Sequence, residues 1–539
     1  MGVIPAFPDL HAEQLECPPG EVETVRMTNP NSICIDQQTA QKWTELGIAE
    51  IIGKLESEEK LEPSEKTELD LGHEIFHTRI GDLELKSDYP TPETAQKLRD
   101  ESFFQRAITV YQLAYPAVAG AGIFYDQDKV GGTYGDILYF SNFMSSDIEL
   151  LTGNISVLYF LSLQDLSDGP IIIDVPTANF NAMVDNVYQQ VLTDIGVAGP
   201  YKGNGGLILI LPPGYDGEIP ENYHVVQSDT MQVLFIGRSF VNDGDFSTAE
   251  SAIKKIKTYK LSESQNPPNQ KFIDVSGKSL KLSHPDTDGF WEFLHKVYSK
   301  ETVVREEDKN LIGLMHSIGI FPGKPFEPDE NSKKLLDEAA IVAELIMRNM
   351  AYDSPIKEHF IYYPGKNWEL GFMTDNPQFE DKNGITQIIP RISFVYQAIT
   401  TSDAMVLELV GKGSKYLMNY RDSEENYLEG SNTYHLNIPA NVPAENFWSV
   451  VVYDAETRSQ IKNNSQKWPG IKSLDSDKLI QNEDGSYDVY FGPESPEDYE
   501  NNWVQTNEGD GFFVIFRFYS PTEAYYDKSW QLPMIEKIR

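Results

Sequence analysis

The chain contains two long blocks of strand-like segments, and a block of amphipathic helical segments lies between them. In the first block, residues 153–240, apolar β-rich runs are broken by turn signals such as Ser167–Gly169 and Pro212–Gly214. In the last block, residues 360–539, apolar and alternating runs are again separated by turns. Strands joined by short turns are typical of antiparallel sandwiches. The pattern predicts a mainly β protein with α-helices and several domains.

Helical segments stand out at two places. At residues 90–115, Thr91 is suited to cap a helix, Pro92 to occupy its first position and Pro116 to end it. Between residues 287 and 352, three further amphipathic segments predict a small all-α module.

The N-terminal residues differ from the rest in composition. Several prolines and a charged patch predict an extension with little order apart from one helix at 39–55. The expected parts of the chain are an N-terminal extension (1–70), a β-sandwich with a helix (71–280), a small helical domain (281–360) and a jelly-roll sandwich (361–539).

The charge balance restricts the partners. The chain has 83 acidic and 44 basic residues, which gives a net charge of −39. Such a surface repels nucleic-acid phosphates and anionic membrane faces, so we expect neither as a partner. The oligomeric state stays open.

The two cysteines, Cys17 and Cys34, both lie near the N-terminus. They either pair or remain free thiols, and alone they make no structural zinc site. The first residues lack the basic and apolar regions of a signal peptide, and no run of about 18 apolar residues occurs. We therefore expect a chain that is cytoplasmic, or secreted and already processed.

One short motif suggests metal chemistry. Residues 73–77 read H-E-x-x-H, in which His73 and His77 would share a helix face and Glu74 could activate a metal-bound water. Gly72 and Gly81 flank the motif, so a strand is the favoured interpretation and the match is then a coincidence. The histidines are retained only as weak metal candidates.

Other catalytic motifs are missing from the sequence. It has no G-x-S-x-G, no phosphate-binding P-loop and no complete G-x-G-x-x-G. The sequence therefore leaves open whether the protein is an enzyme, and it leaves any cofactor unknown.

Several long motifs occur in a characteristic order along residues 75–539. They are TRIGDLELKSDYPTPETAQKLRDESFFQRAITVYQLAYP, DLSDGPIIIDVP, GNGGLILILPPGYDG, NFWSVVVYDAETRSQI, NEDGSYDVYFGP, NNWVQT and FRFYSPTEAYYDKSWQLPMI. In these motifs the chain resembles a two-domain bacterial family, known as domains of unknown function 1254 and 1214. The resemblance implies an immunoglobulin-like sandwich, a small helical domain and a jelly roll, and it implies no catalytic residues.

One family motif is altered in this chain. Relatives carry N-x-D-T-x-Y before the D-L-x-x-G-P strand, whereas this chain reads Asn154-Ile155-Ser156-Val157-Leu158-Tyr159. The Asn and Tyr remain, and the acidic residue and Thr are replaced. An activity that depended on that acid would be absent here.

Aromatic and arginine residues in the strand-rich blocks are the candidate ligand-binding groups. Aromatic rings with nearby polar groups can line a pocket, although core packing is the commoner role of a single ring. An arginine beside an apolar segment needs an anionic partner, and we expect a structural acid more than a ligand carboxylate. The candidates are Tyr134, Asp136, Asn154, Tyr159, Arg238, Arg391, Trp448, Trp503 and Arg517.

Two functions follow from these observations. The first is a protein that binds a small molecule or glycan in a cleft between β-sandwich domains. The second is a hydrolase, with or without a metal, that acts on a small molecule or glycan. A purely structural role is a third alternative.

Overall fold

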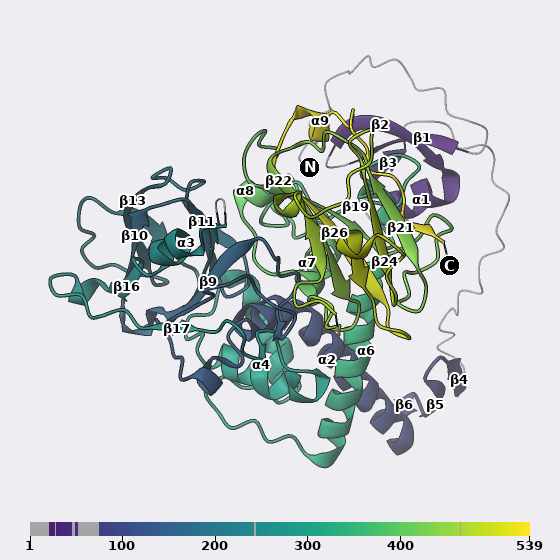
Figure 1. The fold of residues 1–539 in the computed structure, drawn as a ribbon. Coiled ribbons are helices and arrows are strands. Elements are labelled where there is room, and N and C mark those ends of the chain that lie inside the picture. Colours follow the sequence, from purple (N-terminus) through teal and green to yellow (C-terminus); the bar gives the residue numbers. More distant parts are fainter. Residues whose placement is uncertain are drawn as a thin grey trace. The chain divides into compact units, whose positions relative to one another are not determined.

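The computed structural model describes residues 21–26, 29–45, 49–51, 75–241, 244–463 and 465–538. The chain forms two compact units, one of residues 1–97 with 380–386 and one of the remainder (Figure 1).

The smaller unit contains two small sheets. In the first, β1 (Glu21–Arg26) pairs antiparallel with both β2 (Asn29–Asp36) and β3 (Ala49–Ile51). The expected helix at 39–55 is shorter and earlier, α1 (Gln37–Glu45), since the chain returns to the sheet at β3. Cys34 is disulfide-bonded, and Cys17 lies outside the described residues.

The second small sheet leads into the first long helix. Its strands are β4 (Ile75–Thr78), β5 (Gly81–Lys86) and β6 (Tyr89–Pro90). Helix α2 (Pro92–Gly122) begins at the expected proline, and the Thr91 Oγ1 accepts a 3.3 Å hydrogen bond from the Thr94 N–H.

The prediction that Pro116 ends α2 is wrong. The helix continues to Gly122 because residues 114–124 are all buried, so packing outweighs the missing backbone hydrogen bond. Among the described residues, Pro92–Val130 has the length and mean hydropathy, 1.3, of a membrane span, which the sequence analysis did not anticipate. In the structure 78% of its apolar window is buried inside the protein, as in a core helix.

The larger unit begins with a sandwich of two sheets. The six-stranded sheet contains, in spatial order, β12 (Val191–Gly196), β11 (Phe180–Asn186), β15 (Gln232–Phe240), β9 (Val157–Asp165), β7 (Ile137–Tyr139) and β17 (Phe272–Asp274). The four-stranded sheet contains β14 (His224–Gln227), β13 (Asn204–Leu211), β10 (Ile171–Thr177) and β16 (Lys257–Lys260). The pairs β13–β14 and β7–β17 are parallel, so the expected all-antiparallel arrangement is wrong in those two places.

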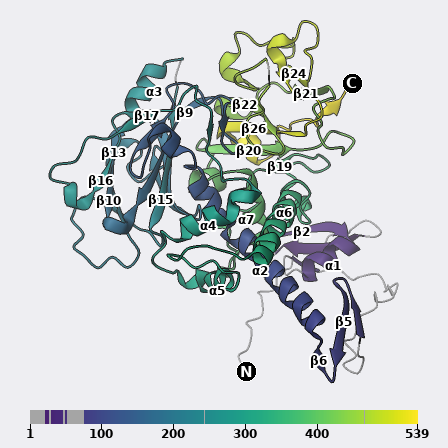
Figure 2. The same ribbon diagram turned by 90° about the horizontal axis from the view of Figure 1, so that it is seen from below.

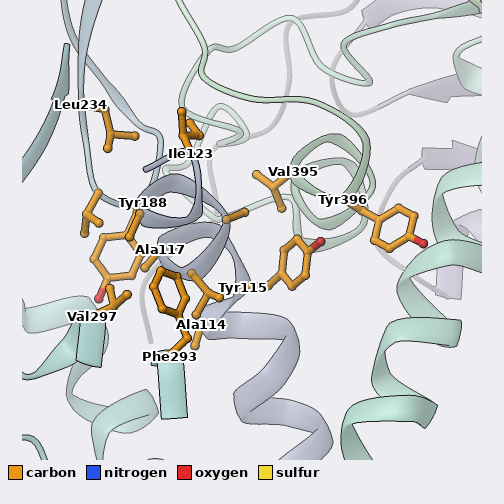
Figure 3. Packing of buried hydrophobic residues seen from close by; sticks show 14 of the residues in the cluster. Ala114, Tyr115, Ala117, Ile123, Tyr188, Leu234, Phe293, Val297, Val395 and Tyr396 are labelled. Carbon is orange, nitrogen blue, oxygen red and sulfur yellow. The ribbon is translucent and has the colours of Figure 1, made fainter. Parts of the chain in front are cut away.

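Alternation along the strands gives the six-stranded sheet two apolar faces. Leu158 and Phe160 of β9 face the other sheet, where they join Ile173 and Ile208 in one core. Leu161 of β9 and its neighbours on the opposite face belong to a second core, which includes α2. Figure 3 shows this second core from close by, with side chains of α2 beside those of other elements.

The expected helical module is present. Its helices are α4 (Phe290–Tyr298), α5 (Lys309–Ser317) and α6 (Glu330–Tyr352), and α7 (Ile388–Gln397) packs against α6 (Figure 2). Tyr111 of α2 stacks on Phe290 with ring centroids 3.7 Å apart, so α2 is shared between the module and the sandwich.

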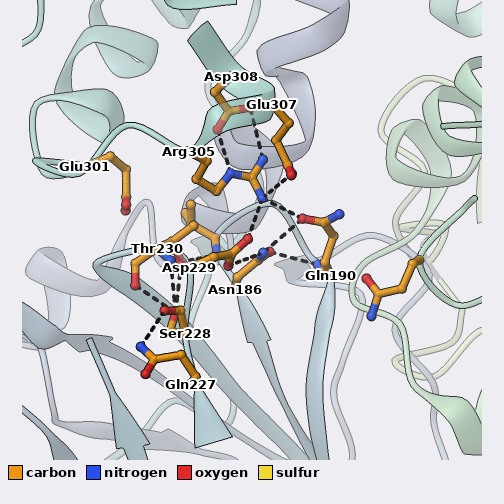
Figure 4. Close-up of polar contacts among 12 residues, drawn as sticks. Asn186, Gln190, Gln227, Ser228, Asp229, Thr230, Glu301, Arg305, Glu307 and Asp308 are labelled. Atoms are coloured by element: carbon orange, nitrogen blue, oxygen red, sulfur yellow. Dashed lines mark hydrogen bonds and ion pairs between the residues drawn. The ribbon is translucent and has the colours of Figure 1, made fainter. Parts of the chain in front are cut away.

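An ion-pair cluster around Arg305 also joins the module to the sandwich (Figure 4). The guanidinium pairs with Asp308 at 2.6 Å and with Asp229 at 2.8 Å, and it donates to the side-chain oxygen of Gln190. This buried arginine has acidic partners within its own structure.

The C-terminal residues form a second sandwich. Its five-stranded sheet contains β19 (Glu369–Leu370), β20 (Ser414–Asn419), β26 (Phe512–Pro521), β22 (Ala444–Asp454) and β23 (Gly470–Lys472). Its four-stranded sheet contains β25 (Trp503–Gln505), β24 (Tyr487–Gly492), β21 (Tyr434–Ile438) and β27 (Glu536–Lys537). The mainly β, multi-domain fold is therefore confirmed, and the jelly-roll connectivity and the domain boundaries stay predictions.

Candidate functional site

A pocket lies where the outer faces of the two sandwiches meet. Its polar end contains Arg238 of β15 and Arg517 of β26. The other lining residues are Leu151, Thr152, Asn154, Tyr159, Met183, Ile236, Gly237, Gly371, Phe372, Phe394, Ala398, Ile399, Thr400, Met405, Tyr416, Met418 and Ile515. The cavity volume is about 60 Å³. Since a single water needs roughly 10–15 Å³ of cavity, the pocket has room for a small organic group.

Strand register explains why an arginine and a tyrosine come together on each side. Tyr159 of β9 lies opposite Arg238 of β15, and Tyr416 of β20 lies opposite Arg517 of β26. Because side chains along a strand alternate between the two faces of the sheet, Ile236 lies on the same face as Arg238, and Ile515 lies on the same face as Arg517. Each sheet therefore presents one arginine–tyrosine pair within an apolar surface.

Arg517 is almost completely buried, with 2% of its surface exposed. Its Nη2 donates a 2.6 Å hydrogen bond to the backbone oxygen of Thr152, which belongs to the first sandwich domain. Its Nη1 is buried and has no hydrogen-bond partner. The guanidinium carbon also lies 5.4 Å from the ring centre of Tyr453.

Arg238 lines the same pocket from the first sandwich. Its Nη1 donates a 3.3 Å hydrogen bond to the hydroxyl of Tyr416, and no other hydrogen bond of its guanidinium exists among the described residues. Tyr416 therefore contacts both arginines, since the Arg517 guanidinium lies 5.7 Å from its ring centre.

No described acidic side chain lies within ion-pair distance of Arg238 or Arg517. The expectation of a structural acidic partner is therefore wrong for both residues within the described part of the chain. Asp194 of β12 is close enough to act electrostatically on Arg238 without touching it. Arg517, which is buried, and Arg238, which is half-buried, thus share one pocket without a paired carboxylate.

The surrounding tyrosines do not supply the missing negative charge. Burial raises the pKa of Tyr159, and burial raises the pKa of Tyr519 to about 12 although Arg517 opposes the shift. Burial also raises the pKa of Tyr453. All three hydroxyls are neutral at pH 7.

The altered family motif forms part of the pocket rim. Asn154 donates a 2.9 Å hydrogen bond from its side chain to the Tyr159 hydroxyl. Ser156, at the place of the acidic residue in relatives, is 1% exposed and lies 3.1 Å from the hydroxyl of Tyr519. Val157, at the place of the threonine, belongs to the apolar core beside α2. This chain therefore has no carboxylate at that position.

One wall of the pocket is the segment 398–405, which links α7 to helix α8 (Asp403–Val406). Its backbone is fixed from the first sandwich, where Gln189 and Asp185 accept hydrogen bonds from the N–H groups of Thr400 and Thr401. Burial raises the pKa of Asp185 well above its usual range.

Four of the residues singled out from the sequence line the pocket, namely Asn154, Tyr159, Arg238 and Arg517. The other five lie elsewhere. The Tyr134 hydroxyl donates to Gln232, and Asp136 pairs with Lys271. Arg391 lies on α7 near Arg305, whose charge acts after burial to lower the Arg391 pKa.

The two tryptophans also have structural contacts away from the pocket. Trp448 stacks on Phe516 in the core of the second sandwich, and Trp503 donates from its indole nitrogen to the backbone oxygen of Gly492. Their proposed part in ligand binding stays a prediction.

The metal candidates occupy the smaller unit. His77 lies on strand β4, as the favoured interpretation expected, and its ring nitrogen is 2.6 Å from Asp82 on an exposed surface. His73 lies outside the described residues. Within the described part of the chain, no three His, Cys, Asp or Glu side chains are grouped so as to hold a metal ion.

Sequence reasoning missed the apolar wall of the pocket. Phe372 stacks on Phe394 of α7 at 4.6 Å between ring centres, and both side chains line the pocket together with Met405. Phe372 lies outside any helix or strand, and Phe394 and Met405 lie on α7 and α8, so no single pattern in the sequence groups them. Tyr416 could have been found, because it lies in an alternating strand near an arginine-bearing one.

A second buried arginine is neutralised within the protein. Arg458 donates a 3.2 Å hydrogen bond to the Tyr396 hydroxyl, which itself donates to the carboxylate of Glu344. Another Arg458 nitrogen lies 3.3 Å from the ring of His284, and burial lowers the pKa of His284 to about 3. Glu344 gives this cluster the acid that the pocket lacks.

Two sandwiches with a helical module between them in sequence, and a small pocket where they meet, define the class of this protein as a two-domain β-rich protein. A model described as "Protein of unknown function (DUF1254)" matches residues 136–260, and one described as "Protein of unknown function (DUF1214)" matches residues 413–523. The two matches confirm the resemblance to these two domains of unknown function that the sequence motifs indicated.

Other comparisons add little. No curated protein matches the sequence. The VPA0106 protein of Vibrio parahaemolyticus has 18% identity and a TM-score of 0.49, over 81% of this chain and 100% of that one. An uncharacterized protein of Burkholderia cenocepacia has 11% identity and a TM-score of 0.37, over 84% and 91%. At TM-scores below 0.5, neither structure informs the fold or function of this chain.

Proposed function

We propose that this protein binds a small organic molecule in the pocket between its two sandwiches. The observation that carries the proposal is the pocket itself, which side chains of both domains line and which is apolar apart from a few converging polar groups. Ligand sites in proteins commonly have this composition and commonly lie at domain interfaces.

The size of the pocket favours a small molecule over a glycan. About 60 Å³ of space accommodates only a few heavy atoms beside the existing side chains. A sugar ring also needs several hydrogen-bonding groups, whereas those of Asn154 and Thr400 are engaged with neighbouring protein groups. The binding function therefore does not extend to oligosaccharides.

The hydrolase alternative has less support. The pocket contains no histidine and no acidic side chain among its lining residues, so general acid–base catalysis by these groups has no candidate there. His77 lies on an exposed strand of the smaller unit. We retain binding as the single proposed function.

A pocket-filling variant tests the proposal. Ala398 lines the pocket, so Ala398→Leu is expected to occupy part of its volume. Ala198 is exposed on the first sandwich, and Ala198→Leu is the matched control. A ligand that binds only the native state raises the melting temperature with its concentration.

The measurement is thermal unfolding of the full chain against a panel of small organic molecules, beside native mass spectrometry of the purified protein. Binding is expected in the wild type and in Ala198→Leu, and a weakened response is expected in Ala398→Leu. Equal responses in all three proteins, or no response to any molecule, would overturn the proposal.

A further inference from the structure

We propose that the molecule bound in this pocket is a short apolar carboxylic acid, whose ionised carboxylate is held between Arg517 and Arg238. This inference rests on the proposed binding function and deepens it, since it names the chemical class of the ligand.

The charge of the pocket favours an anion. Buried Arg517 and half-buried Arg238, without a paired acid, leave a positive potential in the pocket. Arg305, in the same chain, shows the usual arrangement, with Asp308 at 2.6 Å and Asp229 at 2.8 Å. Neither Arg238 nor Arg517 has such a partner among the described residues, so the fitting ligand is an anion.

N–H groups of both arginines remain available to donate hydrogen bonds to a ligand. Arg517 uses Nη2 for the Thr152 carbonyl, and its Nη1 is left buried without an acceptor. Arg238 uses Nη1 for Tyr416. A planar carboxylate can accept from two N–H groups at once, and it thereby matches guanidinium geometry.

The other polar groups of the pocket limit how polar the ligand can be. Asn154 and Tyr159 are hydrogen-bonded to each other, and the Thr400 hydroxyl donates to a backbone oxygen. The guanidinium groups are therefore the main donors left for a ligand. A phosphate or a polyol would bring more polar atoms than this site can satisfy.

The apolar walls of the pocket determine the part of the ligand beyond its carboxylate. Phe372 and Phe394 stack on one another, and the sulfur-containing side chains of Met183, Met405 and Met418 complete the lining. Methionine and phenylalanine surfaces favour an aromatic or branched aliphatic body. With about 60 Å³ available, that body is small.

The experiment is isothermal titration calorimetry of the full chain with benzoate and isobutyrate. Benzamide and isobutyramide, which have nearly the same shape without charge, are the ligand controls, and inorganic phosphate tests the other anion class. Binding of at least one acid at one equivalent, at least tenfold tighter than its amide and than phosphate, is expected.

Variants connect the binding to the two arginines. Arg517→Met and Arg238→Met are each expected to weaken acid binding at least tenfold and to leave amide binding nearly unchanged. Arg517→Lys and Arg238→Lys retain the charge and lose the planar fork, so an intermediate loss is expected. Arg421, which pairs with Asp353 away from the pocket, gives the control Arg421→Met, with wild-type affinity expected. Any methionine variant that fails to fold leaves its lysine counterpart to decide.

The outcomes separate this inference from the proposed function. Amides that bind as tightly as the acids, or acid binding that survives loss of either arginine, would overturn the inference while pocket binding stands. Phosphate that binds in preference to both acids would overturn the carboxylate class. Absence of binding by all five probes overturns the inference, and the Ala398→Leu experiment then decides the function separately.

Discussion

The Arg238 guanidinium donates a 3.3 Å hydrogen bond to the hydroxyl of Tyr416. The two residues belong to sheets of different sandwiches, and Tyr416 lies opposite Arg517 in its own sheet. One tyrosine thus connects the two arginines, and any ligand that binds both of them also links the two sandwiches.

Buried arginines that serve a ligand and those that serve the fold should respond differently to mutation. Arg517→Met removes an unpaired buried charge, so the free energy of unfolding is expected to stay level or to rise by about 1–3 kcal/mol. Arg305→Met leaves the buried Asp308 without its partner, so a loss of about 3–5 kcal/mol is expected. Urea unfolding of both variants measures the difference. A loss in Arg517→Met as large as that in Arg305→Met would mean that Arg517 stabilises the fold.

The sequence contains most of the information about the fold and part of the site. The N-terminus of α2 follows from Thr91 and Pro92, because capping is local chemistry. Its continuation through Pro116 depends on burial against two other elements, which no local pattern encodes. The same limit applies to the parallel pair β13–β14, since strand pairing is settled by tertiary contacts.

The pocket residues also divide into those that the sequence predicts and those that it does not. Arg238 and Arg517 were recognisable because a charged residue in an apolar strand needs a partner. The expected acid is not found among the described residues, because the neighbours across the strands are Tyr159 and Tyr416. Phe372 lies in an irregular segment and Phe394 on helix α7, and their meeting depends on tertiary packing, so it could not be derived from the chain order.

Asp194 should make stability depend on pH. Burial first, and Asp403 second, raise the pKa of Asp194 to about 6. The folded state therefore holds this proton more tightly than the unfolded state. Between pH 4 and pH 6 the contribution of Asp194 to the free energy of unfolding falls as pH rises, by on the order of 1–3 kcal/mol.

Asp194→Asn isolates that contribution. The variant is expected to be more stable than the wild type at pH 7 and to lose the difference near pH 4, where both side chains are neutral. Thermal or urea unfolding at a series of pH values measures it. A variant that is less stable at pH 7 would show that the charged form of Asp194 is favourable in the folded state.

The same residue should affect ligand affinity. The titratable and charged groups that interact with Asp194 are Asp185 of β11, Asp403 of α8 and Arg238 of β15. When Asp194 is protonated, the field of Arg238 is less compensated, so benzoate affinity is expected to rise as pH falls from 7.5 to 5.5. The gain is roughly threefold to tenfold for a charge acting across the pocket at an effective dielectric constant near 20. Calorimetry should show this gain in the wild type and little of it in Asp194→Asn, where a persisting pH dependence would assign it to another group.

Close packing at the end of α2 gives a prediction for two glycines. A Cβ on Gly122 would lie 2.5 Å from the backbone nitrogen of His284, which cannot move without shifting the chain. Gly122→Ala is therefore expected to lower the free energy of unfolding by about 2 kcal/mol or more. Gly313 of α5 has open space around its Cβ position, so Gly313→Ala is expected to raise the free energy of unfolding by about 0.5–1 kcal/mol. Urea midpoints of the two variants test the pair, and equal signs would contradict the packing of α2 described above.

The net charge of −39 should make the binding kinetics depend on salt in an unusual direction. At low ionic strength the acidic surface repels an approaching carboxylate at long range, although the two arginines of the pocket attract it once it has entered. Salt screens exposed charges over about 10 Å at 0.1 M and affects buried pairs much less. The association rate of benzoate is therefore expected to rise severalfold between 10 mM and 300 mM salt, with a smaller change in the dissociation rate.

Stopped-flow measurement of intrinsic tryptophan fluorescence, with benzamide as the uncharged control, tests this salt dependence. An association rate that falls with salt would mean that a local positive path guides the ligand and outweighs the net charge.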